Sequence, residues 1–216
     1  MFEGFSPETV DFLWGIRMNN SRDWFEPHKK VYVTYLYEPM RELGKEMFEP
    51  FLERPGAILK VSRIYRDARL HHPLPYKERL WFCIRQEGEQ WTDLPCLYFE
   101  MAPEGASYGF GYWQPKAALM EQLRKEWAAE PEKILKLLKD TQQATGVPVT
   151  AGLRYKRPKP CPVAELEDLY SWRGVITCDV HEDVSPELFG PELAQRVKKM
   201  FAGLMPLYDY FNQCAL

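Results

Sequence analysis

The 216-residue sequence contains no long apolar run. No stretch reaches the roughly 18 to 20 uncharged apolar residues that a helix needs to cross a bilayer, so we expect no membrane partner. The first residues, Met1–Phe5, also lack the basic region and the apolar core of a secretory signal. We therefore expect the chain to remain in the cytoplasm.

Cysteine and histidine are too scattered for a metal centre. The five cysteines form no Cys-x-x-Cys pair, and an odd number of dispersed thiols favours reduced, buried side chains over disulfides or zinc ligands. These residues are Cys83, Cys96, Cys161, Cys178 and Cys214. The adjacent His71 and His72 would point in different directions on a strand or a helix. We predict no metal site and no cofactor.

An excess of positive charge is absent as well. The chain has 28 lysines and arginines against 31 aspartates and glutamates, and its formal net charge is −3. Bulk electrostatics of this kind do not favour nucleic acid as a partner. Only a local basic patch could bind a polyanion. The sequence leaves the oligomeric state open.

The apolar content is sufficient for one well-packed domain over 1–216. Hydrophobic residues make up 45% of the chain and aromatic residues 14%, which can form a substantial core. We therefore expect the chain to fold around a single core rather than as two small domains.

The order of sequence patterns predicts an α+β fold. Helices are expected after Ser6, after Asn20 or Ser21 as the cap, over 28–52, after Pro115 and Pro131, and from Pro191 to the C-terminus. Short runs of β-branched and aromatic residues predict antiparallel strands near 57–67, 80–86, 95–102 and 107–113, with others near 149–155 and 174–180. We expect a mainly antiparallel sheet, packed by N-terminal, central and C-terminal helices.

One stretch concentrates basic side chains around a carboxylate. Its candidate ligand-binding residues are Arg63, Arg66, Asp67 and Arg69, followed by Tyr76 and Lys77. Two interpretations remain open. Arg63 or Arg69 could pair with Asp67 in a partly buried ion pair that fixes the strand register. Alternatively, an arginine fork could bind a carboxylate or phosphate in a cleft, with Lys77 as a supplementary charge.

Strand alternation divides this stretch between two faces. If the strand continues without a bulge, the row of Ala57, Leu59 and Val61, which we expect to face the core, continues with charged and polar side chains. These are Arg63, Tyr65, Asp67 and Arg69. Arg66 would then lie on the opposite, less buried face. The four charged residues cannot form one simple clamp unless a bulge or turn follows Arg63.

A glycine-rich strand is the second candidate. Along it, Ser107, Gly109, Gly111 and Trp113 share one nearly bare face. Gly109, Gly111 and Trp113 could contact a ligand, because glycine permits close approach to the backbone. A helix or loop packed across the glycines, or a bulge, would explain the pattern equally well. The spacing lacks the third glycine of a dinucleotide fingerprint.

A basic run with an enclosed aromatic residue, 154–159, is the third candidate. Lys156 and Arg157 could bind phosphate groups, those of nucleic acid included, or the run could be a solvated loop. The chain has no Gly-x-Ser-x-Gly elbow, Walker loop or His-Glu-x-x-His motif. We assign no catalytic residue, and whether the protein is an enzyme stays open.

Several distinctive motifs are spread along the chain. They are Phe5-Ser6-Pro7-Glu8-Thr9 with Phe12-Leu13, Asn19-Asn20, Arg22-x-Trp24-Phe25-Glu26-x-His28-Lys29, Arg63-Ile64-x-Arg66-Asp67-x-Arg69, Pro75-Tyr76-Lys77, Gly109-x-Gly111-x-Trp113-x-Pro115, Lys156-Arg157-Pro158, Ser185-Pro186-Glu187-Leu188 and Pro206-Leu207. Together they resemble the motifs of one protein family, domain of unknown function 2461. The resemblance implies membership of the family but no mechanism. Where relatives carry a Ser-Lys-Asp-Lys-Ser-like segment, this chain has Leu70-His71-His72-Pro73-Leu74, so an anion site here would differ from theirs.

Three hypotheses about function follow. The first is a pocket for a small anionic ligand bearing phosphate or carboxylate, in a binding protein or an enzyme. The second is an interaction module that binds protein or nucleic acid through the 154–159 loop. The third is a structural protein without a ligand. Ordered anions between the arginines and Lys77 would support the first hypothesis.

Overall fold

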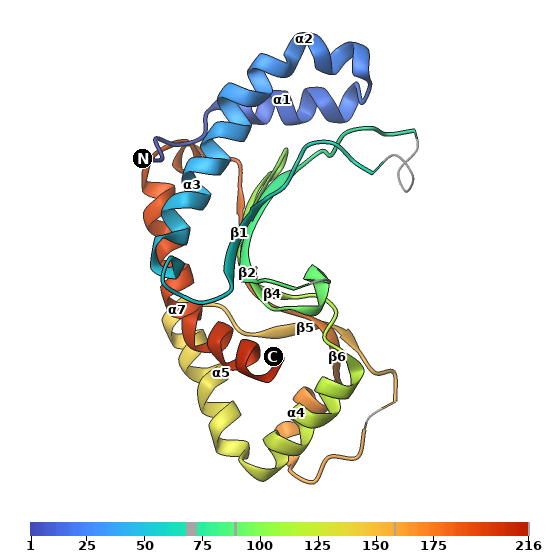
Figure 1. Ribbon diagram of the computed structural model, residues 1–216. Helices are drawn as coiled ribbons and strands as arrows, with labels where there is room; N and C mark the ends of the chain where they lie inside the picture. The colour runs from blue at the N-terminus through green and yellow to red at the C-terminus, as the bar shows by residue number, and fades with distance from the viewer. Residues whose placement is uncertain (68–72, 89, 158, 216) are drawn as a thin grey trace. The chain divides into compact units, whose positions relative to one another are not determined.

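The computed structural model describes residues 1–67, 73–88, 90–157 and 159–215. Six strands form one antiparallel sheet with the spatial order β1-β2-β3-β4-β6-β5 (Figure 1). The strands are β1 (Ala57–Val61), β2 (Leu80–Gln86), β3 (Cys96–Ala102), β4 (Gly105–Tyr112), β5 (Thr150–Arg154) and β6 (Trp172–Asp183). The expected α+β class is therefore confirmed.

Helices precede, interrupt and follow the strands along the chain. They are α1 (Pro7–Met18), α2 (Arg22–Tyr32), α3 (Glu38–Phe48), α4 (Ala117–Ala129), α5 (Pro131–Thr145), α6 (Glu167–Ser171) and α7 (Glu192–Ala215). The Ser21 hydroxyl accepts a hydrogen bond from the Trp24 amide at 3.3 Å, so Ser21, rather than the alternative Asn20, is the N-cap of α2. The short α6 was not predicted from the sequence.

A π-helix, Val33–Tyr37, interrupts the segment that the sequence predicted as helical over 28–52. Pro39 has no amide hydrogen, so it cannot donate to the carbonyl four residues earlier, at Tyr35. The Thr9 hydroxyl donates to that carbonyl instead. Pro39 accounts for the wider π-helical turn, and Thr9 of α1 supplies the hydrogen bond that the Tyr35 carbonyl would otherwise lack.

Two compact units make up the chain. The first contains Met1–Ile84, Tyr98–Tyr108 and His181–Lys198, and the second contains Arg85–Leu97, Gly109–Val180 and Lys199–Leu216. Each unit includes part of the sheet and part of α7, and each has its own core. The single domain expected over 1–216 stays a prediction.

Aromatic side chains form the core of the first unit beside α1 and α2. Phe25 is fully buried, and its ring lies 4.3 Å from that of Tyr76 and 5.8 Å from those of Tyr32 and Tyr65, centroid to centroid. Phe12 contacts the same ring at 6.4 Å. Because these rings come from both helices and from residues that follow β1, the cluster fixes those residues against α2.

The second unit has a core around two tryptophans, Trp127 of α4 and Trp172 of β6. Their rings meet edge to face with centroids 6.4 Å apart, and the Trp127 indole donates to the Tyr210 hydroxyl at 2.9 Å. Arg124 of α4 is 3% exposed. Its guanidinium donates to the backbone carbonyls of Tyr170 and Trp172, so a buried cation joins α4 to the start of β6.

Candidate anion site

The residues between β1 and β2 form an irregular antiparallel pair, which we call the ribbon: residues 62–67 and 73–78. Three contacts join its two segments: the bridge between Tyr65 and Tyr76, a 2.9 Å bond from the Arg66 amide to the Pro75 carbonyl, and a 2.7 Å bond from the Lys77 amide to the Ile64 carbonyl. The regular strand β1 therefore ends earlier than the predicted strand near 57–67. Arg69, His71 and His72 lie outside the described residues.

The predicted assignment of faces in this stretch is wrong. Ile64 is 1% exposed and Ser62 is also buried, whereas Arg63, Tyr65 and Asp67 are exposed. Ile64 is the strongly apolar side chain of the stretch, so its burial sets the face. Ser62 is satisfied on that face because its hydroxyl accepts from the Trp81 amide at 3.1 Å.

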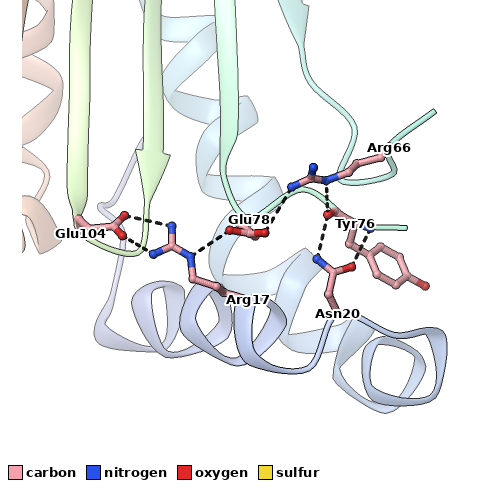
Figure 2. Close-up of polar contacts among 6 residues, drawn as sticks. All are labelled: Arg17, Asn20, Arg66, Tyr76, Glu78 and Glu104. Carbon is pink, nitrogen blue, oxygen red and sulfur yellow. Dashed lines mark hydrogen bonds and ion pairs between the residues drawn. The ribbon is translucent and has the colours of Figure 1, made fainter. Parts of the chain in front are cut away.

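Arg66 is held by the ribbon itself. Its Nε donates to the Tyr76 carbonyl at 2.6 Å, and its Nη2 lies 3.4 Å from an oxygen of Glu78 (Figure 2). The Asn20 side chain donates to the same carbonyl and accepts from the Tyr76 amide, both at 3.0 Å. Arg66 therefore has a bracing role, with Glu78 as the carboxylate in this pair.

Glu78 lies between two arginines (Figure 2). Its other oxygen accepts from Arg17 Nε at 3.1 Å, and Arg17 also pairs with Glu104 through both terminal nitrogens. The hydrogen bond to Glu104 is the main cause of a raised pKa for Arg17. Positive and negative groups thus alternate along a chain of four side chains, which we call the charge chain: Arg66, Glu78, Arg17 and Glu104.

Lys77 and Arg63 occupy a different electrostatic environment. The Lys77 ammonium donates to the Arg63 carbonyl at 2.7 Å and lies 5.7 Å from the centre of the Trp81 ring. Burial lowers the pKa of Lys77, and the charges of Arg63 and Arg66 lower it further. Among the described residues, no carboxylate forms an ion pair with Arg63 or Lys77. The ribbon carries three cationic side chains and two carboxylates, so its net charge is positive by one. The cations are Arg63, Arg66 and Lys77, and the carboxylates are Asp67 and Glu78.

Gly109, Gly111 and Trp113 of the predicted glycine face belong to the second unit. A Cβ added to Gly109, whose φ is +156°, would lie 2.3 Å from the Cys178 carbonyl oxygen in β6. A Cβ on Gly111 would lie 2.9 Å from the Trp113 ring. Both glycines therefore admit other parts of the chain to close contact. Their role and that of Trp113 in ligand binding stay predictions.

Of the basic residues that follow β5, Lys159 contacts an aromatic ring, whereas Lys156 and Arg157 are exposed. The Tyr155 ring lies 5.2 Å from the Arg124 guanidinium and 4.7 Å from the Lys159 ammonium. Lys156 and Arg157 are exposed, and neither has an ion-pair partner within the described ranges. Their proposed role in binding polyanions stays a prediction.

Sequence reasoning missed Arg17, Glu78 and Glu104 because the charge chain joins positions far apart in the sequence. Asn20 belonged to a recognised motif, but nothing local indicated that its side chain would hold the Tyr76 backbone. Within residues 1–67, 73–88, 90–157 and 159–215, no three His, Cys, Asp or Glu side chains come together as a candidate metal site.

The fold and the ribbon define an α+β protein whose antiparallel sheet leads into a braced, cationic extension. The family model described as conserved hypothetical protein (DUF2461) matches residues 8–210, so the chain belongs to this family. A comparison with curated proteins finds no match. In the part of the chain that the structure describes, no helix has the length and apolar character to cross a bilayer.

Proposed function

We propose that the ribbon binds a small anion bearing phosphate or carboxylate groups. The observation that carries this proposal is the environment of Lys77, which is partly buried near Arg63 and Arg66 without a carboxylate partner among the described residues. Close cations without matching anions are electrostatically costly, and a bound anion would relieve their repulsion. We propose binding and assign no catalytic residue.

The ribbon residues would have distinct roles in this site. Arg63 offers a planar fork that suits two oxygens of a carboxylate or phosphate, whereas Lys77 offers a point charge. Arg66 is already bonded to Glu78 and to the Tyr76 carbonyl, so it would position the ribbon and contribute charge at longer range. Asp67 would disfavour ligands of high negative charge density on its side of the ribbon.

Free thiols support a reducing location for this ligand. All five cysteines lack a disulfide, and burial raises the pKa of Cys178 to about 11, which keeps its thiol protonated and inert. We therefore expect a cytoplasmic ligand, since reduced cysteines persist in that compartment.

Replacing Arg63 or Lys77 with glutamine should weaken binding of inorganic phosphate or citrate. We expect each change to raise Kd about tenfold, because a charge-assisted hydrogen bond contributes about 1.5–3 kcal/mol. Isothermal titration calorimetry at low salt would measure it. Lys60→Gln is the matched control, since Lys60 is an exposed cation of β1 outside the ribbon.

Unchanged affinity in both ribbon variants would overturn the proposed site. Loss of binding on changing Lys156 and Arg157 instead would favour the basic loop as the anion site. Thermal unfolding of each variant without ligand would separate a loss of affinity from a loss of structure.

The pH dependence of stability should depend on Lys77. Its pKa in the folded chain lies below the ordinary value of 10.5, so the unfolded chain retains this proton at a pH where the folded chain has released it. The free energy of unfolding therefore contains a contribution that rises with pH between the lowered pKa and 10.5. Urea denaturation at several pH values should show this rise in the wild type relative to Lys77→Gln. If the free energy of unfolding changes with pH in the same way in the wild type and in Lys77→Gln, the proposed environment of the lysine is contradicted.

A further inference from the structure

Strand β5 lies at one edge of the sheet, within the second unit. It is the last strand in the spatial order, and among the described strands it pairs only with β6. An edge strand leaves one row of backbone amides and carbonyls without a partner strand, and an extended segment of another chain can pair with that row. Most of β5 is exposed, namely Thr150, Gly152, Leu153 and Arg154. Its free edge is therefore open to solvent.

The register of β5 against β6 determines which backbone groups lie on the free edge. Gly152 lies opposite Val175 in this antiparallel pair. The Val175 amide donates to the Trp113 carbonyl at 3.0 Å, on the β4 side of β6. Opposed residues either exchange their hydrogen bonds or both turn their backbone groups outward, so the amide and carbonyl of Gly152 point away from β6. By alternation, those of Thr150 do the same.

The usual protection of an edge strand is weak in the first part of β5. Proteins commonly block such edges with lysine, proline or an inward-pointing charge. Thr150 and Gly152 carry none of these groups, and Gly152 has no side chain to keep another backbone at a distance. Leu153 is 49% exposed and offers an apolar contact beside the edge. The regular edge ends where the register shifts between Leu153 and Arg154, and Arg154 is paired with Asp168.

Two cations follow directly after this edge. The Tyr155 amide donates to the Ser171 carbonyl at 2.8 Å, so the chain stays beside the residue that precedes β6. Lys156 and Arg157 come next, and both are exposed. Neither forms an ion pair with a described residue. A segment that lies along β5 and continues past its end would therefore meet two available positive charges, which favour carboxylates at that end.

We propose that β5 binds an acidic, extended segment of a partner protein, which adds a further strand to the sheet. The backbone groups of Thr150 and Gly152 would pair with the segment, and the exposed leucine would contact an apolar side chain. Lys156 and Arg157 would select carboxylates. A second copy of the chain fits less well, because residues 146–153 contain no aspartate or glutamate to meet this basic pair. The inference does not depend on the anion site of the ribbon.

The test uses the full chain and a fluorescein-labelled peptide of alternating threonine and valine residues that ends in a run of glutamates. Fluorescence anisotropy at low salt should show saturable binding. The same peptide with an N-methyl group on every threonine and valine amide keeps its charges but cannot donate the hydrogen bonds of a strand. It should bind about tenfold more weakly. A peptide with glutamines in place of the glutamates should lose affinity to a similar degree.

A matched pair of variants tests the free edge, and another tests the charges. Thr150→Pro removes an outward amide that Thr150→Ala keeps, so only the proline variant should bind the peptide about tenfold more weakly. Both should unfold at similar temperatures, because this amide has no partner in the sheet. Lys156→Gln combined with Arg157→Gln should lower affinity and its dependence on salt. Lys125→Gln combined with Lys139→Gln, exposed changes on α4 and α5, should leave both intact.

Four results would overturn the proposal. They are no saturable binding of the unmodified peptide, equal binding of its N-methylated form, unchanged affinity in Thr150→Pro, and tighter binding of a single-stranded oligonucleotide of equal charge. The last would assign the basic pair to nucleic acid instead. Arg63→Gln should leave peptide binding unchanged, so failure of the ribbon to bind phosphate would not affect the peptide result.

Discussion

Replacing Phe25 with alanine is expected to lower the free energy of unfolding by about 3–5 kcal/mol, the usual cost of deleting a buried phenyl ring. The side chain is fully buried and contacts four other aromatic rings. Its removal would leave a cavity that rigid neighbouring rings cannot readily fill. Urea denaturation would measure the loss.

The same change should affect the ribbon more than the rest of the first unit. Tyr65 and Tyr76 pack on the Phe25 ring from the two segments of the ribbon. Without that ring, hydrogen exchange at the Arg66 and Lys77 amides should accelerate, because their bonds to the facing segment would open more often. Phe48→Ala is a suitable control, since Phe48 is only partly buried, and it should cost clearly less. A loss below about 1 kcal/mol for Phe25→Ala would contradict the described packing.

Replacing Arg124 with alanine is expected to destabilise the second unit by about 2–6 kcal/mol, because two stranded acceptors cost about 1–3 kcal/mol each. The guanidinium is 3% exposed and donates to two backbone carbonyls, those of Tyr170 and Trp172. Its partner Glu121 is half exposed, so water can solvate that carboxylate after the change. The loss should therefore come mainly from the carbonyls.

Two further variants test this explanation. Arg124→Lys keeps the charge but lacks the planar fork that reaches both carbonyls, so it should retain only a minor part of the stability. Arg173→Ala removes an exposed arginine in β6 and should change stability by less than about 0.5 kcal/mol. Full stability in Arg124→Lys would show that charge, rather than the two hydrogen bonds, is what matters at this position.

Local signals predicted most of the fold. The predicted strand 80–86 coincides with β2, and Ser21, one of the two expected caps, is the N-cap of α2, because hydrophobic periodicity and capping depend on nearby residues. The length of β6 and the π-helix were not predicted. At the π-helix, the Tyr35 carbonyl accepts from the Thr9 hydroxyl, 26 residues earlier in the chain, and no local pattern encodes that contact.

The candidate site was predictable in composition but not in arrangement. The sequence places Arg66 and Lys77 in one basic cluster, and the ribbon brings the two side chains near each other. The buried face of the stretch after β1 was assigned wrongly, because strand alternation defines two rows of side chains without saying which row faces the core. The partner of Arg66 was missed because Glu78 acts together with Arg17, which is distant in sequence. A glycine gives the same signal whether a ligand or another strand approaches it, so Gly109 could not be assigned from sequence alone.

The charge chain has a consequence for how this family can diverge. Glu78 serves Arg66 and Arg17 at once, and Arg17 also holds Glu104. Loss of one member leaves its neighbours with unmatched charge, so single replacements should be selected against while paired replacements are tolerated. Positions 17, 66, 78 and 104 should therefore covary among relatives, with an apolar residue at position 17 accompanied by a neutral residue at 104, whereas Glu78 would keep Arg66 as its partner.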